Sequence, residues 1–141
     1  MHMKRVLSIL LVISALLALS GCGSFKVYQM NDILPPLVDI TTQYPYTEKI
    51  TVTECSSGKS LEFTEGADHD MIRMRFEGIQ AIREKPKSDD PAPLFDIVFT
   101  TTDSTVAISV LSEYAFLYDG YKYEILRSGI DLIYFENLFT E

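Results

Sequence analysis

The chain has 141 residues, with 12 lysines and arginines against 20 aspartates and glutamates, which gives a formal net charge of −8 at pH 7. That charge keeps a protein soluble and repels phosphate groups, so the sequence predicts no nucleic-acid partner. The length suits one folded domain, and the aromatic residues include 8 Tyr and 8 Phe but no Trp.

The N-terminal segment has the organisation of an export signal. Lys4 and Arg5 form a short positive region, and residues 6–19 are apolar apart from Ser8 and Ser14. About fourteen apolar residues give roughly 21 Å of helix, which is shorter than a ~30 Å hydrocarbon core. The length therefore favours a cleavable signal over a permanent membrane span.

The sequence Leu19-Ser20-Gly21-Cys22 follows, and it resembles the lipobox of bacterial lipoproteins. The resemblance implies cleavage before Cys22 and a diacylglyceryl thioether on its sulfur. The protein would then sit on the extracytoplasmic side of the cell membrane, because two acyl chains anchor a protein stably. The alternative is an uncleaved N-terminal anchor in which the cysteine is incidental.

These features divide the chain into a signal peptide at 1–21, a lipid-anchored tether at 22–30 and one domain at 31–141. The signal contains two of the 12 basic residues and no acidic residue, so the remainder carries 10 basic and 20 acidic residues, or −10. Attraction to an anionic surface therefore cannot replace the lipid as the anchor. Residues 31–47 contain Pro35-Pro36 and the apolar residues Ile33, Leu34, Leu37, Val38 and Ile40, which predicts an extended segment lying partly on the domain.

Alternating apolar residues predict six strands, at 48–55, 59–63, 94–101, 105–111, 113–118 and 121–126. Asp119-Gly120 between the last two strands is a strong hairpin signal, because a type I′ turn needs positive φ twice. Between the second and third strands, apolar residues at helical spacing predict a helix that starts within residues 65–68 and runs to about 83 or 84. Residues 85–93 contain three prolines and are expected to form a mobile loop.

A second helix is predicted from Gly129 to about Thr140, capped by Ser128 with Asp131 three residues on. The element order ββα-ββββ-α lacks βαβ alternation and predicts an α+β fold. In it the central helix packs on one face of an antiparallel sheet, and a C-terminal helix follows. The layout resembles small uncharacterised lipoproteins of Firmicutes, through the sequence Tyr-Asp-Gly-Tyr-Lys-Tyr at 118–123, and this likeness implies no known activity.

Arg75 is the first candidate binding residue, because it falls inside the apolar arc of the predicted central helix. An unpaired guanidinium among isoleucines would be costly, so we expect a structural arginine paired with a carboxylate or with carbonyl groups. The alternative is an anion-binding arginine on the helix surface.

Phe135 and Phe139 are the other candidate binding residues, on the predicted C-terminal helix. Ile130, Tyr134 and Leu138 form one apolar stripe of this helix, and Leu132 joins the two phenylalanines in a second stripe. We expect the first stripe to pack on the sheet. The second would then be partly exposed to a protein partner or a second copy, or else be covered by residues 31–47.

The remaining chemistry is sparse. Cys55 has no partner for a disulfide if Cys22 carries lipid, and we expect a half-buried thiol rather than a reactive one. His69 is the only histidine after the signal, and a metal site at Asp68-His69-Asp70 is disfavoured because neighbours at a helix start point in different directions. Phosphate-binding, dinucleotide-binding and zinc motifs are missing, so the sequence predicts no cofactor and no metal.

Two functions of different classes fit this inventory. The first is a membrane-anchored binding or regulatory module, which follows from the lipid anchor, the small domain and the apolar last helix. The second is a small hydrolase or ligand carrier that uses a cleft between sheet and helix. A deep pocket with convergent polar groups would favour the second, and a flat apolar patch would favour the first.

Overall fold

The computed structural model describes residues 26–34 and 47–140. Eight strands form one sheet: β1 (Val27–Gln29), β2 (Thr47–Glu54), β3 (Ser60–Phe63), β4 (Gln80–Glu84), β5 (Phe95–Thr101), β6 (Thr105–Ser112), β7 (Ala115–Tyr118) and β8 (Tyr121–Arg127). The described helices are α2 (Met30–Ile33), α3 (Gly66–Met74) and α4 (Leu132–Asn137). The expected α+β class with an antiparallel sheet is confirmed.

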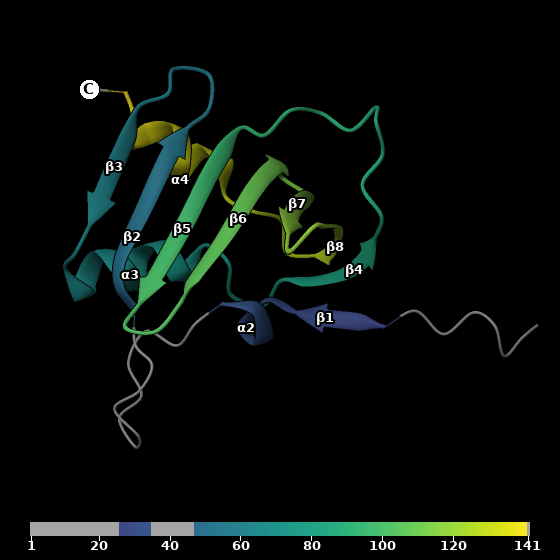
Figure 1. The fold of residues 1–141 in the computed structure, drawn as a ribbon, viewed down its shortest axis with the longest axis horizontal. Helices are drawn as coiled ribbons and strands as arrows, with labels where there is room; N and C mark the ends of the chain where they lie inside the picture. Colours follow the sequence, from purple (N-terminus) through teal and green to yellow (C-terminus); the bar gives the residue numbers. More distant parts are fainter. Residues whose placement is uncertain (1–25, 35–46, 141) are drawn as a thin grey trace, which may run out of the picture.

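Every neighbouring pair of strands is antiparallel, in the order β1-β4-β8-β7-β6-β5-β2-β3. The β2–β3, β5–β6, β6–β7 and β7–β8 pairs join strands that follow one another in the chain. The β2–β5 pairing and the two pairings of β4, with β8 and with β1, bring distant segments together. As a result β1 and β3 form the two edges of the sheet, and β1 lies at the lower right in Figure 1.

One face of the sheet carries the core. Burial alternates strictly along β5, where Phe95, Ile97 and Phe99 are buried and the residues between them are half-buried. The Phe76 ring lies 6.3 Å from that of Phe99, and the Phe135 ring lies 5.9 Å from that of Phe95. Phe76 follows α3 and Phe135 belongs to α4, so both helices cover the same face, behind the strands in Figure 1.

The six strands predicted from alternation are all present, with bounds that differ by one or two residues. The predicted central helix is wrong in its second half, because α3 ends at Met74 and residues 80–84 form β4. The C-cap of α3 is Arg75, and Gly78, three residues later, has a φ of +73°, a left-handed conformation that a continuous helix excludes. The apolar residues beyond it then alternate between the two faces of a strand paired on both sides.

The N-terminal boundary also needs correction. Residues 27–30, predicted as tether, belong to the fold: β1 pairs with β4, and the Met30 side chain is 1% exposed. Residues 31–33 continue as helix α2 and Leu34 is buried, so the start of the segment predicted as extended is helical. Pro35-Pro36, the rest of that segment to residue 46, and the signal and lipobox lie outside the described residues.

The C-terminal helix is shorter than predicted. It covers Leu132–Asn137, and its N-cap is Asp131, whose carboxylate accepts a hydrogen bond from the Tyr134 N–H at 3.1 Å. Ser128, the predicted cap, instead has a φ of +63° in the turn that leaves β8. Within residues 26–34 and 47–140, no helix has the length and apolar character needed to cross a membrane.

Candidate functional site

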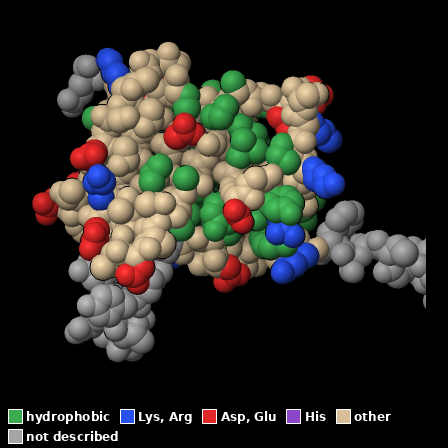
Figure 2. Space-filling view, in the orientation of Figure 1, with side chains coloured by type: hydrophobic (Ala, Val, Ile, Leu, Met, Phe, Trp, Pro, Cys, Tyr) green, Lys and Arg blue, Asp and Glu red, His purple; other side chains and the backbone are tan. Residues whose placement is uncertain are grey.

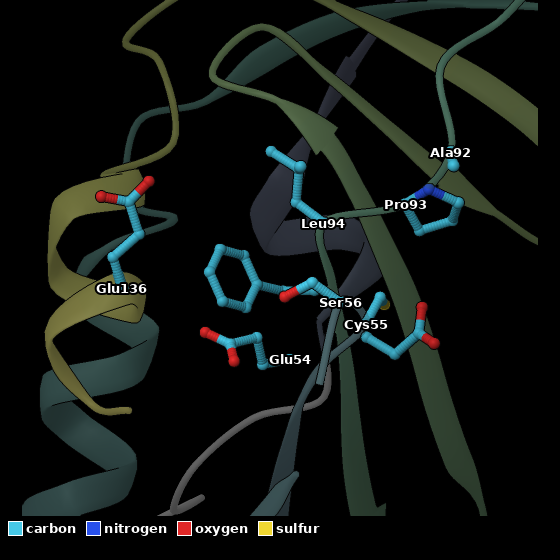
Figure 3. Close-up of a pocket in the computed structure, with 9 residues that line it drawn as sticks. Glu54, Cys55, Ser56, Ala92, Pro93, Leu94 and Glu136 are labelled. Atoms are coloured by element: carbon cyan, nitrogen blue, oxygen red, sulfur yellow. The ribbon is translucent and has the colours of Figure 1, made fainter. Parts of the chain in front are cut away.

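An open cleft of about 660 Å³ lies between one end of the sheet and α4. Three segments build it: the end of β2 with its turn, the start of β5 with the residues before it, and α4. The lining residues are Glu54, Cys55, Ser56, Ala92, Pro93, Leu94, Phe95, Asp96 and Glu136. Figure 3 shows Glu136 on the α4 side and the labelled residues of the other two segments opposite it.

Backbone hydrogen bonds fix the sheet side of the cleft. The Cys55 N–H donates to the Leu94 carbonyl at 3.0 Å, and the Leu94 N–H donates to the Val110 carbonyl at 2.7 Å. The turn after β2 closes through the Gly58 N–H, which donates to the Glu54 carbonyl at 2.8 Å. Gly58 has a φ of +72°, a conformation that glycine adopts at little cost. The cleft is therefore held by the strand framework.

An apolar wall and three carboxylates give the cleft its chemistry. Leu94 is 42% exposed, and Phe95 is buried beneath with its ring stacked on that of Phe139, 6.2 Å between centroids. Glu54, Asp96 and Glu136 supply the negative charge, and no lysine or arginine lines the cleft. The arrangement suits a cationic group with apolar neighbours.

Two of these carboxylates are positioned by hydroxyl groups. The Ser57 hydroxyl donates to Glu54 Oε1 at 2.6 Å, and the Ser109 hydroxyl donates to Asp96 Oδ1 at 2.6 Å. Glu136 is exposed on α4 and makes no ion pair within the described residues. Its carboxylate is consequently available to an incoming cation.

Cys55 brings the only sulfur to the cleft, and it is half-buried, as expected. Burial raises the pKa of its thiol above the ordinary 9.0, and the negative charge of Asp96 and a hydrogen bond to that carboxylate raise it further. At neutral pH the group is therefore a thiol and a poor nucleophile.

His69 lies away from the cleft, and its side chain already has a hydrogen-bond partner. It is 4% exposed in α3, and its Nε2 is 2.7 Å from the Phe63 carbonyl oxygen. No group of three or more metal-binding side chains that could hold an ion occurs in the described part of the chain.

Arg75 is paired, as the structural interpretation expects. Its Nη1 lies 3.3 Å from Asp131 Oδ2, and its guanidinium carbon lies 4.2 Å from the centre of the Tyr134 ring. The arginine thus links the end of α3 to the start of α4. Both partners are outside the cleft lining, so the arginine supports α4 rather than the candidate site directly.

The expectation of a partly exposed second stripe on the last helix is wrong for Phe135. Its side chain is fully buried, with ring centroids 5.8 Å from Phe76 and 5.9 Å from Phe95. The helix is too short to keep its two stripes apart, and Ile130 lies before its first turn. Phe139 is half-buried and lines a smaller hollow of about 310 Å³ with Leu138 and β3.

No protein-family model, curated protein or solved structure matches this chain. The function must therefore be inferred from the residues themselves. The sequence had suggested a cleft between sheet and helix only as an alternative. It did not identify the residues of the cleft, because three distant segments form them.

Proposed function

We propose that this chain is an extracytoplasmic lipoprotein, held in the cell membrane by lipid on Cys22, and that it acts as a binding module. The acidic cleft is the binding site, and its ligand is a cationic side chain with an apolar neighbour, presented by a protein or peptide partner. The observation that carries this proposal is that Glu54, Asp96 and Glu136 line one cleft together with apolar residues and without any basic residue.

The dimensions and charge of the cleft support a ligand of this kind. A volume of about 660 Å³ falls within the range of known ligand sites. A Lys or Arg side chain would place its methylene groups against Leu94 and its charged end beside Glu136. The cleft is open, which suits a group carried on a larger partner.

The alternative from a different class is a ligand carrier or a small hydrolase that uses the same cleft. The location between sheet and helix favours a carrier as much as a protein-binding site. A hydrolase has less support, because the Cys55 pKa is raised and His69 bonds to the Phe63 carbonyl elsewhere. Nucleophilic catalysis by a thiol requires the opposite pKa shift and a nearby base.

The binding proposal is tested by NMR titration of the protein with Lys-Phe amide whose α-amine is acetylated. The control ligand is the same peptide with its lysine Nζ acetylated as well, so that it carries no positive charge. We expect amide shifts confined to residues 54–58, 92–96 and 136, and a severalfold weaker response to the acetylated ligand. Glu136→Gln should weaken binding, whereas Asp70→Asn removes the same charge from α3 outside the cleft and should not. Equal effects of the two variants would refute the cleft as the site.

The anchor is tested separately by membrane fractionation. We expect Cys22→Ala to release the domain from membranes or to leave an unprocessed precursor. If mass spectrometry finds an unmodified Cys22 in membrane-bound wild type, the proposed lipid anchor is wrong. The proposed binding site in the cleft would not be affected by that result.

A further inference from the structure

Two cations and three tyrosines meet at the β1 edge of the sheet, far from the cleft. They are Lys26, Tyr28, Arg83, Tyr121 and Tyr123, which we call the tyrosine–cation cluster. The Tyr28 and Tyr123 rings meet edge to face with centroids 5.5 Å apart. The Arg83 guanidinium carbon lies 4.2 Å from the Tyr121 ring centre and 5.1 Å from that of Tyr28, and Lys26 Nζ lies 4.8 Å from the Tyr28 ring centre.

The register explains why these groups meet. Tyr28 pairs with Ala81 and Val27 with Ile82, which places Lys26 beside Arg83. Arg83 in turn pairs with Tyr123 on β8. Because side chains alternate along a strand, Tyr121 and Tyr123 point to the opposite face from Lys122. The cluster is therefore separate from the carboxylates Glu84, Asp90 and Glu124, which surround Lys122.

The outer groups of the cluster are accessible. Lys26 and Arg83 are exposed, and Tyr121 is 37% exposed, whereas Tyr123 is buried. Neither cation forms an ion pair with a carboxylate anywhere in residues 26–34 and 47–140. Both instead face aromatic rings, which leaves their charge open to an external anion. Figure 2 shows Lys and Arg side chains gathered along the right side of the molecule, where β1 and β4 lie.

The position of the cluster in the chain points to the anion. Lys26 follows Cys22 by four residues, so an extended chain places the two at most about 14 Å apart. If Cys22 carries lipid, as the proposed function states, the cluster is held within reach of the membrane surface. Tyrosine rings favour the membrane–water interface, and Lys and Arg beside a membrane are attracted to anionic headgroups.

We infer that the tyrosine–cation cluster rests on the headgroups of anionic phospholipids beside the anchor and fixes the orientation of the domain. The net charge of the protein opposes general adsorption to such a surface, so only this basic edge is attracted. The cleft is built on β2, β5 and α4, toward the opposite edge of the sheet, at the upper left of Figure 1. In this orientation the cleft faces away from the membrane, open to a partner.

The absence of tryptophan in the chain allows a direct test. A single Trp is introduced by Tyr121→Trp at the cluster, or by Ile133→Trp, at a side chain 68% exposed on α4, as the matched control. Each full-length lipidated variant is reconstituted into phosphatidylethanolamine–phosphatidylglycerol vesicles that contain a headgroup spin label. We expect quenching of the Tyr121→Trp variant to exceed that of the Ile133→Trp variant severalfold.

The difference should disappear when Lys26→Gln and Arg83→Gln are added, although the protein remains bound through its lipid. It should also shrink at 1 M salt, where the Debye length falls to about 3 Å. Equal quenching of the two Trp variants on bound protein would overturn the inferred orientation while leaving the anchor intact. A difference in quenching that survives loss of both cations would overturn the role of the cluster. Failure of the wild type to associate with vesicles after lipid processing would instead refute the proposed anchor.

Discussion

Lys122 and Asp90 are joined by an ion pair of 2.7 Å between Nζ and Oδ1, and this contact fixes the loop between β4 and β5 to β8. The loop was expected to be mobile because of its three prolines. Instead, Asp90 accepts a second hydrogen bond from the Lys87 N–H at 2.6 Å, which closes a turn within the loop. The same loop leads into the segment 92–94 of the cleft, so the ion pair helps to hold one side of the candidate site.

The Lys122–Asp90 pair predicts a pH dependence of stability. The hydrogen bond from Lys122 lowers the pKa of Asp90 below its ordinary 3.8, and the Lys87 N–H lowers it further. A depressed pKa means that the stabilisation is complete above pH 3.8 and is lost as the pH falls through the folded-state value. Asp90→Asn should therefore be less stable than wild type at pH 7.

Chemical denaturation across pH 2–7 checks this prediction. We expect the difference between wild type and Asp90→Asn to close below about pH 3.8, since the carboxyl becomes neutral. Asp89→Asn removes an exposed neighbouring carboxylate and serves as the control. A stability difference for Asp90→Asn that is independent of pH would show that the ion pair does not stabilise the fold.

The second prediction concerns Phe135, which the sequence suggested as a partner surface. Its full burial between Phe76 and Phe95 predicts that Phe135→Ala lowers the free energy of unfolding by about 3–5 kcal/mol. Ile133→Ala on the exposed side of the same helix should change it by no more than about 0.5 kcal/mol. Unfolding curves of the two variants are compared with that of the wild type. An unchanged stability of Phe135→Ala would contradict the place of Phe135 in the core.

The strands could be predicted and the central helix only in part, for a physical reason. In β5 and β6, alternation reflects one buried face, which the sequence shows directly. In β4 the half-buried Ile82 lies on the face opposite Ala81, and the strand is central through its pairing with β1 and β8. Those partners are 38 to 55 residues away in sequence, so local periodicity could not indicate them.

The cleft was beyond prediction for the same reason. Glu54, Asp96 and Glu136 are separated by about 40 residues each, and only the β2–β5 pairing and the docking of α4 bring them together. Phe135 illustrates a related limit. Helical spacing showed two apolar stripes, but the sequence did not show that Phe135 would be buried against Phe76 and Phe95.

A third prediction concerns Arg75 and its pairing with Asp131. The ion pair and the contact with the Tyr134 ring are partly exposed, so we expect Arg75→Met to cost roughly 1–2 kcal/mol of stability. A double-mutant cycle with Asp131→Asn should show a coupling of about 0.5 kcal/mol. If Arg75→Met leaves the melting temperature unchanged and abolishes binding of an anion or partner, the structural role is wrong.

The last prediction concerns Cys55, whose environment decides between a binding site and a thiol-based enzyme. Because burial and then the Asp96 carboxylate raise its pKa above 9.0, alkylation should be slow at pH 7 and should accelerate only in strongly alkaline solution. Asp96→Asn removes the charge and should move the pH–rate curve toward lower pH. Glu136 lines the same cleft but does not contribute to the raised pKa of Cys55. Glu136→Gln should therefore leave the pH–rate curve of Cys55 alkylation unchanged.

Iodoacetamide labelling followed by mass spectrometry measures these rates on Cys22→Ala protein, in which Cys55 is the only thiol. A wild-type-like curve for Asp96→Asn would show that burial alone sets the pKa. Fast labelling at neutral pH would mean that the thiolate is stabilised, and the hydrolase alternative would then gain the nucleophile it lacks. Slow labelling keeps the carboxylates, rather than the sulfur, as the groups that meet a ligand.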